Sequence, residues 1–270
     1  MSGQQPDPAE VIEVDDGVLP IGEHVEEVSG EDGRKVRHRG IYLLPNLFTT
    51  AAIFCGYYAI IAGMQHRFEN AAIAIFVAMI FDGLDGRVAR LTNTQSAFGV
   101  QYDSLSDMVS FGVAPGLVMF NWALVQVGKF GWSAAFLYCA CAALRLARFN
   151  TQVDTADKRY FTGLASPAAA AVIAGTVWLG CDVQIEKGLV PVLLTILTAV
   201  TGLLMITNLR YYSFKGIDFK GRVPFIYLLA VLLIIMVLIW HTELALLSIA
   251  VIYALSGPVL HWRTGKSVNM

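Results

Sequence analysis

Charged residues are scarce in this chain. They make up 15% of its 270 residues, whereas a soluble domain averages about 25%. Hydrophobic residues make up 56%, and the mean hydropathy is +0.59. Because the apolar residues gather in long runs, the composition excludes an ordinary soluble domain and predicts an integral membrane protein embedded in a lipid bilayer.

The chain also lacks the cysteine spacing that is typical of disulfide frameworks and of zinc sites. The four cysteines lie in or beside apolar runs, and their spacing fits neither pattern. They are Cys55, Cys139, Cys141 and Cys181. We interpret them as small buried hydrophobic residues. The basic residues are spread over loops rather than gathered in one patch, so nothing indicates nucleic-acid binding.

The first 33 residues contain no Lys or Arg, but they contain ten acidic residues and three prolines. This composition predicts a disordered acidic tail. The segment has no basic region followed by an apolar one, so it does not resemble a signal peptide. We expect a tail over residues 1–40 with a basic juxtamembrane end, a membrane domain over 41–262 and a short cytoplasmic tail over 263–270.

Apolar windows of about 20 residues, the length that crosses a bilayer, recur along the rest of the chain. They predict an all-α, polytopic membrane bundle of about eight transmembrane helices. The windows are residues 43–64, 70–91, 100–126, 131–149, 164–182, 188–207, 223–240 and 244–261. Lys and Arg accumulate in cytoplasmic loops. With the N-terminus inside, 16 of the 19 bases fall on the inner side, which predicts both termini in the cytoplasm and a location in the cell inner membrane.

Four aspartates interrupt the second and third windows. They are Asp82, Asp85, Asp103 and Asp107. Residues three or four apart share a helix face, and a connection of about eight residues brings the two pairs face to face. Carboxylates at membrane depth are costly and usually functional. Hard oxygen ligands suit Mg²⁺, Mn²⁺ or Ca²⁺, and Mg²⁺ fills its coordination shell with substrate phosphate. The spacing therefore predicts a cytoplasmic divalent-metal site that takes a phosphate-bearing substrate.

Small residues recur beside the first aspartate pair, at Gly83, Gly86 and Ala89. Such residues let a ligand approach the backbone closely, but they also let two helices pack closely, and the spacing leaves both readings open. Arg90 can bind phosphate with two parallel hydrogen bonds. A carboxylate-lined ion transporter is a further alternative that spacing alone leaves open.

The segment resembles the signature of the CDP-alcohol phosphotransferases, Asp-x2-Asp-Gly-x2-Ala-Arg-x8-Gly-x3-Asp-x3-Asp. Every fixed position is present: Asp82, Asp85, Gly86, Ala89, Arg90, Gly99, Asp103 and Asp107. The segments at 45–50, 143–150, 161–167 and 213–215 are similar to the phosphatidylserine synthase branch, although Ala165 stands where that branch has proline. The resemblance covers residues 41–261.

This resemblance implies an enzyme that transfers the phosphatidyl group of CDP-diacylglycerol to the hydroxyl of L-serine and releases CMP. It implies one or two ions of Mg²⁺ or Mn²⁺ held by the four aspartates, with Asp107 also the general base. Ca²⁺ also suits such a site. It further implies a homodimer. The residues that would contact CDP-diacylglycerol are Asn46, Thr49, Asp82, Gly83, Asp85, Gly86, Arg90 and Gly99.

The serine carboxylate needs a cation, and Arg145, Arg148 and Lys215 are the candidates. Their position at inner helix ends is equally typical of topogenic charge. Asn46 and Thr49 are also typical of residues that cap a helix start. Sister enzymes that use glycerol 3-phosphate, inositol phosphate or choline as the acceptor remain an alternative.

Overall fold

The computed structural model describes residues 28–29, 35–36, 43–92, 96–151, 160–181, 188–212 and 240–264. The chain divides into two units, Met1–Arg39 and Gly40–Met270. In the first unit, β1 (Val28–Ser29) and β2 (Lys35–Val36) form an antiparallel pair. The rest of the acidic tail predicted from composition lies outside the described residues.

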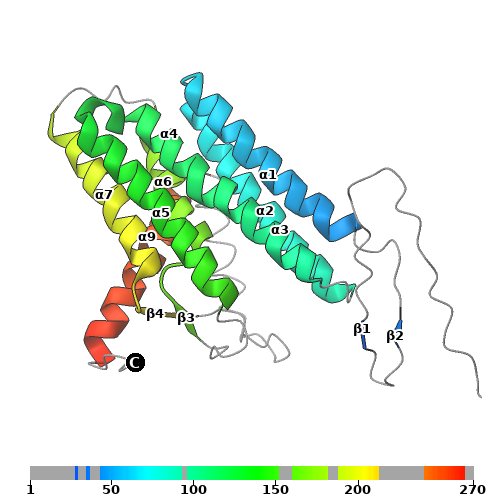
Figure 1. Cartoon of the computed structure of the whole chain (residues 1–270). Coiled ribbons are helices and arrows are strands. Elements are labelled where there is room, and N and C mark those ends of the chain that lie inside the picture. The colour runs from blue at the N-terminus through cyan, green and yellow to red at the C-terminus, as the bar shows by residue number, and fades with distance from the viewer. Residues whose placement is uncertain are drawn as a thin grey trace, which may run out of the picture. The chain divides into compact units, whose positions relative to one another are not determined.

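The second unit is a bundle of helices (Figure 1). In chain order they are α1 (Leu43–Met64), α2 (Phe68–Leu91), α3 (Ala97–Asp107), η1 (Met108–Val113), α4 (Ala114–Trp122), η2 (Leu124–Val127), α5 (Lys129–Thr151), α6 (Ser166–Gly180), α7 (Leu189–Ile206) and α9 (Thr242–Thr264). One short antiparallel pair accompanies them, β3 (Tyr160–Thr162) with β4 (Arg210–Tyr212). The described part of this unit is therefore helical apart from that pair, as the apolar windows predict.

Four of the described helices, α1, α5, α7 and α9, are long and apolar enough to cross a membrane. Helix α6 is apolar but has only 15 residues, and α2 carries several charged residues along its 24. The predicted span at 223–240 lies almost entirely outside the described residues. The structure therefore supports a membrane-spanning helical protein, while the number of eight spans stays a prediction.

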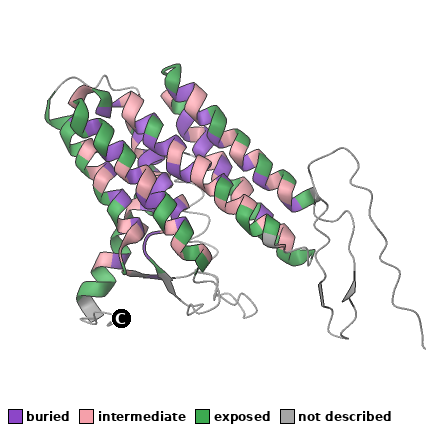
Figure 2. Ribbon diagram, viewed as in Figure 1, coloured by how far each residue is buried: buried purple, intermediate pink, exposed green. Residues whose placement is uncertain are grey.

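The surface and the interior of the bundle differ in side-chain size. Figure 2 shows buried residues where the helices face one another and exposed residues along their outward faces. Large hydrophobic side chains are exposed there, among them Phe54 on α1, Leu193 on α7 and Ile252 on α9. Many buried positions are alanines, such as Ala59 and Ala174. Small buried residues and large exposed apolar ones are what helices packed in lipid require.

The third window forms one continuous helical run made of α3, η1 and α4. The run begins at Ser96, whose Oγ accepts a hydrogen bond of 2.9 Å from the backbone N–H of Gly99. Its middle part, η1, is a π-helix that starts directly after Asp107. Short π-helical stretches inside α-helices occur often at functional sites.

The alternating direction of the helices gathers the polar side chains at one end of the bundle. We call this the aspartate end; it contains the C-terminal parts of α2, α5 and α7 and the N-terminal parts of α1, α3 and α6. Ser104 of α3 and Asn150 of α5 hydrogen-bond to each other there, at 3.0 and 3.2 Å. Between α7 and α9, burial raises the pKa of Tyr211 to about 12, so its hydroxyl stays protonated and donates to the carbonyl of Ala254.

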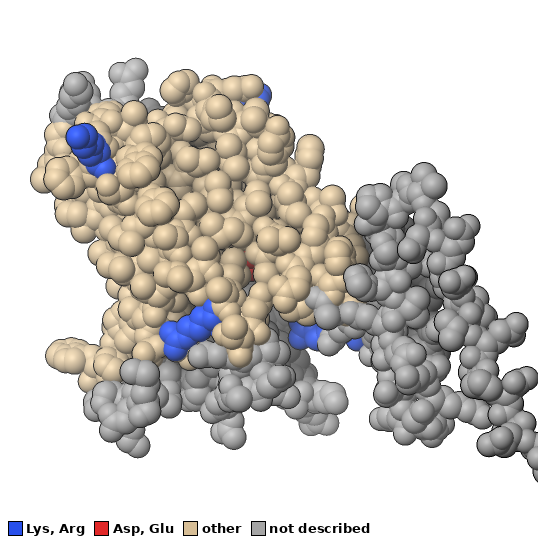
Figure 3. Space-filling view, viewed as in Figure 1, with Lys and Arg blue, Asp and Glu red and all other residues tan. Residues whose placement is uncertain are grey.

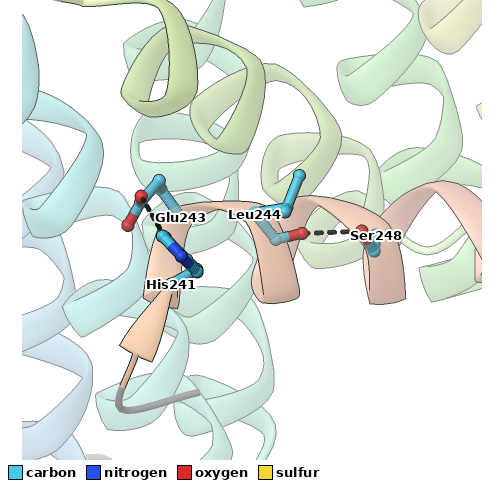
Figure 4. A network of polar contacts seen from close by, with 4 residues as sticks. All are labelled: His241, Glu243, Leu244 and Ser248. Atoms are coloured by element: carbon cyan, nitrogen blue, oxygen red, sulfur yellow. Dashed lines mark hydrogen bonds and ion pairs between the residues drawn. The ribbon is translucent and has the colours of Figure 1, made fainter. Parts of the chain in front are cut away.

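The opposite end holds the α1–α2 turn and the start of α9. Residues 66–70 and Cys181 line a cavity of about 260 Å³ there. At the start of α9, His241 Nδ1 lies 3.8 Å from Glu243 Oε1, and Ser248 Oγ donates to the carbonyl of Leu244 (Figure 4). These groups are far along the helices from the aspartates, so they take no part in the site described next.

Candidate metal centre and active site

The aspartates of α2 and α3 form a cluster. Asp82, Asp85 and Asp103 each offer one carboxylate oxygen, and these three oxygens all lie within 4.8 Å of one another. Asp85 is buried, whereas Asp82 and Asp103 are partly exposed. The structure thus brings together residues from both of the pairs that the sequence singles out.

Asp103 of the cluster and the nearby Asp107 each have an unsatisfied atom. Oδ1 of Asp103 and Oδ1 of Asp107 are buried and have no hydrogen-bond partner among the described residues. A buried oxygen without a partner costs free energy that a bound cation would recover. Three convergent carboxylates are also the hard oxygen donors that Mg²⁺, Mn²⁺ and Ca²⁺ prefer. The residues therefore fit a divalent cation.

Asp107 interacts with both the carboxylate cluster and a cation. The negative charges of Asp82 and Asp103 act on it, and so does the positive charge of Arg145. It is the last residue of α3, directly before the π-helical turn. Asp107 therefore belongs to the same group of interacting charges as the cluster and Arg145.

Asp85 is held by a residue of α1. Thr49 Oγ1 donates a hydrogen bond of 2.7 Å to Asp85 Oδ2, and it also lies 3.1 Å from the carbonyl oxygen of Pro45. Both side chains are buried. Ser106 Oγ in turn donates to the carbonyl of Thr49 at 3.2 Å. Thr49, predicted to contact CDP-diacylglycerol or to cap the helix, therefore uses its hydroxyl to orient a carboxylate of the cluster.

Gly83 and Gly86 border open space. A methyl group added at either residue would meet no described atom within 4 Å, although both lie on α2 beside the cluster. Gly56, by contrast, would bring a methyl group to 2.7 Å from Ser110 Oγ. Close packing against another described helix therefore does not explain Gly83 and Gly86, and the close approach of a ligand there stays a prediction.

Three other predicted residues lie at the same end. Arg90 is exposed, and its Nε donates to the carbonyl of Gly86 at 2.8 Å. A methyl group at Gly99 would lie 3.9 Å from Asn46 Oδ1. Asn46 and Gly99, which are far apart in the sequence, are thus neighbours at the starts of α1 and α3.

The two arginines of α5 have different partners. Arg145 Nη1 donates to Ser166 Oγ of α6, and its charge interacts with Asp107 and Asp82. Arg148 Nη2 donates to Asn208 Oδ1 at 2.7 Å, and Nη1 lies 3.5 Å from the carbonyl of Ile206. Arg145 therefore faces the aspartates, whereas Arg148 binds the C-terminal end of α7. Lys215, the third predicted cation, lies outside the described residues.

The surface agrees with a site recessed in an apolar body. On the face seen in Figure 3, the Lys and Arg side chains that the structure describes lie toward the two ends of the bundle. A small patch of acidic side-chain atoms is visible in a hollow of the uncharged band between them. Some acidic side-chain atoms are thus accessible from the uncharged face of the bundle.

Two residues near the site are not singled out by the sequence patterns. Ser166 accepts the hydrogen bond from Arg145, and Tyr253 of α9 interacts electrostatically with the same arginine. Ser166 belongs to the segment 161–167, which carries the family resemblance. The resemblance draws attention to that segment but does not indicate a role for Ser166. Tyr253 lies in an apolar window without any charged neighbour, and no pattern in the sequence indicates its position.

Comparison with known proteins gives consistent matches. Residues 42–203 match the family described as CDP-alcohol phosphatidyltransferase. A CDP-diacylglycerol–serine O-phosphatidyltransferase of Helicobacter pylori is 36% identical over 222 residues, which are 82% of this chain and 92% of that protein. Proteins of the same name from Methanocaldococcus jannaschii and Bacillus subtilis are 37% and 31% identical, over 76% and 64% of this chain and 90% and 91% of their own lengths.

Proposed function

Because the chain belongs to the CDP-alcohol phosphatidyltransferase family, we propose that it is a CDP-diacylglycerol–serine O-phosphatidyltransferase. The enzyme transfers the phosphatidyl group of CDP-diacylglycerol to the hydroxyl of L-serine and releases CMP. The observation that carries this proposal is the length of the likeness to enzymes of that name, which reaches 92% of the Helicobacter pylori protein. The carboxylate cluster lies within the matched residues 42–203.

The cluster supplies the ligands for the metal. Asp82, Asp85 and Asp103 would hold Mg²⁺ or Mn²⁺, and Asp107 is near enough to the cluster to be a further ligand or to serve a second ion. Such an ion, when bound, neutralises charge on the diphosphate and stabilises the departing CMP. Thr49 keeps the Asp85 carboxylate in place through its 2.7 Å hydrogen bond.

The cytidine diphosphate group lies along the exposed face of α2. The open space at Gly83 and Gly86 supports this proposal, because a ligand there meets backbone rather than side chain. Arg90, at the end of the same helix, is available for a phosphate oxygen. Asn46 and Gly99 border the other side of the site, where α1 and α3 begin.

Asp107 acts as the general base for the acceptor hydroxyl. It accepts the hydroxyl proton as the serine oxygen forms a bond to the phosphorus of the phosphatidyl group. The bond from that phosphorus to the bridging oxygen breaks, and CMP leaves with that oxygen. A free carboxylate is a weak base, with a pKa of about 3.9, so Asp107 works chiefly through its position.

Arg145 binds the carboxylate of L-serine. Its location beside Asp107 supports this assignment, because the acceptor must bring its hydroxyl to that aspartate. Arg148 is less suited, since Asn208 and the end of α7 occupy its guanidinium. Lys215 remains a second candidate for this carboxylate.

The remaining features of the proposal concern the whole protein in its membrane. We propose eight spans in the cell inner membrane, both termini and the active site on the cytoplasmic side, and a homodimer. The distribution of Lys and Arg along the sequence supports the orientation. The parts of the chain are a tail over 1–40, the membrane domain over 41–262 and a cytoplasmic tail over 263–270.

The direct test is CMP release by the purified full-length protein in micelles that contain CDP-diacylglycerol. Serine, glycerol 3-phosphate, inositol phosphate and choline are compared as acceptors, with Mg²⁺, with Mn²⁺ and after chelation of divalent ions. We expect release that requires both serine and a divalent ion. Asp107→Asn should lower the rate roughly 10²- to 10⁴-fold, the usual contribution of a general base.

Glu69→Gln is the matched control for Asp107→Asn, because Glu69 is an acidic residue of α2 at the opposite end of the bundle; it should retain the wild-type rate. CMP release with another acceptor in place of serine would move the enzyme to a sister reaction of the family. If folded protein releases no CMP with any acceptor, and ion flux is found in vesicles instead, the proposal is wrong and the transporter alternative takes its place.

A further inference from the structure

Ser166 occupies an unusual position for a serine. It is the first residue of α6, it is fully buried, and Pro167 follows it. A serine near a helix start commonly caps the helix, but here the capping position belongs to Ala165, and no side chain caps α6. The Ser166 hydroxyl instead accepts a hydrogen bond from Arg145 Nη1.

A hydrogen bond to a guanidinium is stronger than one between neutral groups, and it fixes direction as well. The five N–H donors of an arginine lie in one rigid plane. Once Nη1 is bound to Ser166, the guanidinium group has little freedom to rotate. Arg145 Nε is buried without a partner among the described residues, and the charge of the group acts on Asp107 and Asp82.

Helix α9 also contributes a side chain that interacts with this arginine. The Tyr253 side chain interacts with the Arg145 charge, so the guanidinium lies where α3, α5, α6 and α9 come together. Four elements thus contribute to the surroundings of one cation, and Ser166 supplies the hydrogen bond from it that the structure describes.

We propose that Ser166 is a positioning residue for the amino-acid acceptor. By accepting the hydrogen bond from Arg145, it keeps the guanidinium aimed at the acceptor site beside Asp107, ready for the carboxylate of serine. An arginine side chain that is ordered in advance loses less conformational freedom when the acceptor binds, so affinity rises without any new contact. This inference rests on the proposed serine transfer.

The test compares steady-state kinetics of the wild type and Ser166→Ala for each substrate separately. Loss of one hydrogen bond to a charged group should raise the KM for serine roughly 10- to 100-fold. The KM for CDP-diacylglycerol and the kcat at saturating serine should change little. Thr176→Val on the same helix is the matched control, because the Thr176 hydroxyl donates to the carbonyl of Val172 within that helix.

A second variant separates an effect through Arg145 from an effect on folding. Arg145→Lys keeps the positive charge but lacks the planar fork. In that background Ser166→Ala should raise the serine KM less than threefold further, because the interaction it removes is already gone. Equal rises in the KM values of both substrates, an unchanged serine KM in the single variant, or a full additional rise in the double variant would each overturn the inference.

The outcomes also distinguish the inference from the proposed function. If the wild type releases no CMP with serine, serine transfer itself is wrong. If the wild type is active with serine and Ser166→Ala has the same serine KM, only the positioning role is wrong.

Discussion

Single side chains at the aspartate end have roles that depend on partners far away in the sequence. Thr49 is the clearest case. Its spacing from the helix start is typical of a cap, and the family resemblance suggests a substrate contact, yet its hydroxyl is bound to Asp85, 36 residues away. A residue that hydrogen-bonds to a metal ligand without touching the metal orients that ligand and tunes metal affinity.

Thr49→Val tests this role, because it removes the hydroxyl while keeping the shape of the side chain. We expect the Mg²⁺ concentration at half-maximal activity to rise about 10- to 100-fold. Activity titrated against Mg²⁺ and Mn²⁺ measures the change. Thr195→Val on α7, where the hydroxyl donates to the carbonyl of Pro191 within the same helix, should leave the titration unchanged. An unshifted midpoint in Thr49→Val would show that Asp85 needs no such partner.

Gly86 gives a second prediction at this scale. Because a larger side chain would enter open space, Gly86→Leu should leave thermal unfolding in detergent unchanged or slightly raise the Tm, since leucine favours helix more than glycine does. The same side chain should obstruct the cytidine diphosphate and raise the KM for CDP-diacylglycerol at least tenfold. A normal KM would place the substrate elsewhere.

The sequence predicts that the aspartates of the two pairs come together, because local spacing sets which helix face they share, and the structure brings Asp82, Asp85 and Asp103 close to one another. The sequence does not predict the hydrogen-bond partners of Arg145 and Arg148. The spacing of the two arginines predicts that they share one helix face, but each long side chain reaches a different hydrogen-bond partner. The partner of Arg145 lies 21 residues further along the chain, and that of Arg148 lies 60 residues further along. Partner choice of this kind depends on tertiary packing and leaves no local pattern.

Helices in this bundle are positioned by small residues at their crossings. Gly56 of α1 is one of these, since a methyl group there would lie 2.7 Å from Ser110 Oγ and 2.8 Å from Ser110 Cα in η1. Ser110 Oγ also donates to the carbonyl of Ala52 at 2.9 Å. This contact aligns the helix that carries Thr49 with the one that carries Asp103 and Asp107.

Gly56→Leu should force these two helices apart. Overpacking of a close contact costs about 1–3 kcal/mol, and we expect a lower Tm together with reduced CMP release, because the carboxylates move with their helix. Thermal unfolding in detergent and the CMP assay measure the two effects. Tyr57→Leu, at the neighbouring exposed position, should be close to wild type in both. Full stability of Gly56→Leu would contradict this packing.

The apolar windows predict where helices begin and end better than they predict the type of helix within a window. The first window and α1 have the same bounds, 43–64. The window 100–126 predicts one helix, whereas the structure has a composite of α3, η1, α4 and η2. A π-helical turn depends on how the run packs against α1 and α5, and the hydrophobic pattern within the window carries no sign of it.

At the scale of the whole molecule, orientation in the membrane is the feature that most needs a measurement. The proposed topology has the α1–α2 turn outside and the end of α2 inside. Gln65 and Arg87 are exposed residues at these two positions. In a variant without the four native cysteines, Gln65→Cys should react with a membrane-impermeant maleimide added to intact right-side-out vesicles. Arg87→Cys should react only after the vesicles are opened, and the reverse pattern would invert the topology.

The π-helical turn after Asp107 holds one more residue than a regular helical turn, so deleting one residue from η1, such as Val109, should leave α3 and α4 in phase. Each residue of an α-helix advances the winding by about 100°, so deleting one residue from the regular helix α4 instead, such as Leu117, would rotate α3 by that angle against the end of α4. Asp103 and Asp107 would then face away from Asp82, even though no ligand had been altered. The metal centre thus depends on a residue count as much as on residue identity, and α4 should accept substitutions more readily than insertions or deletions.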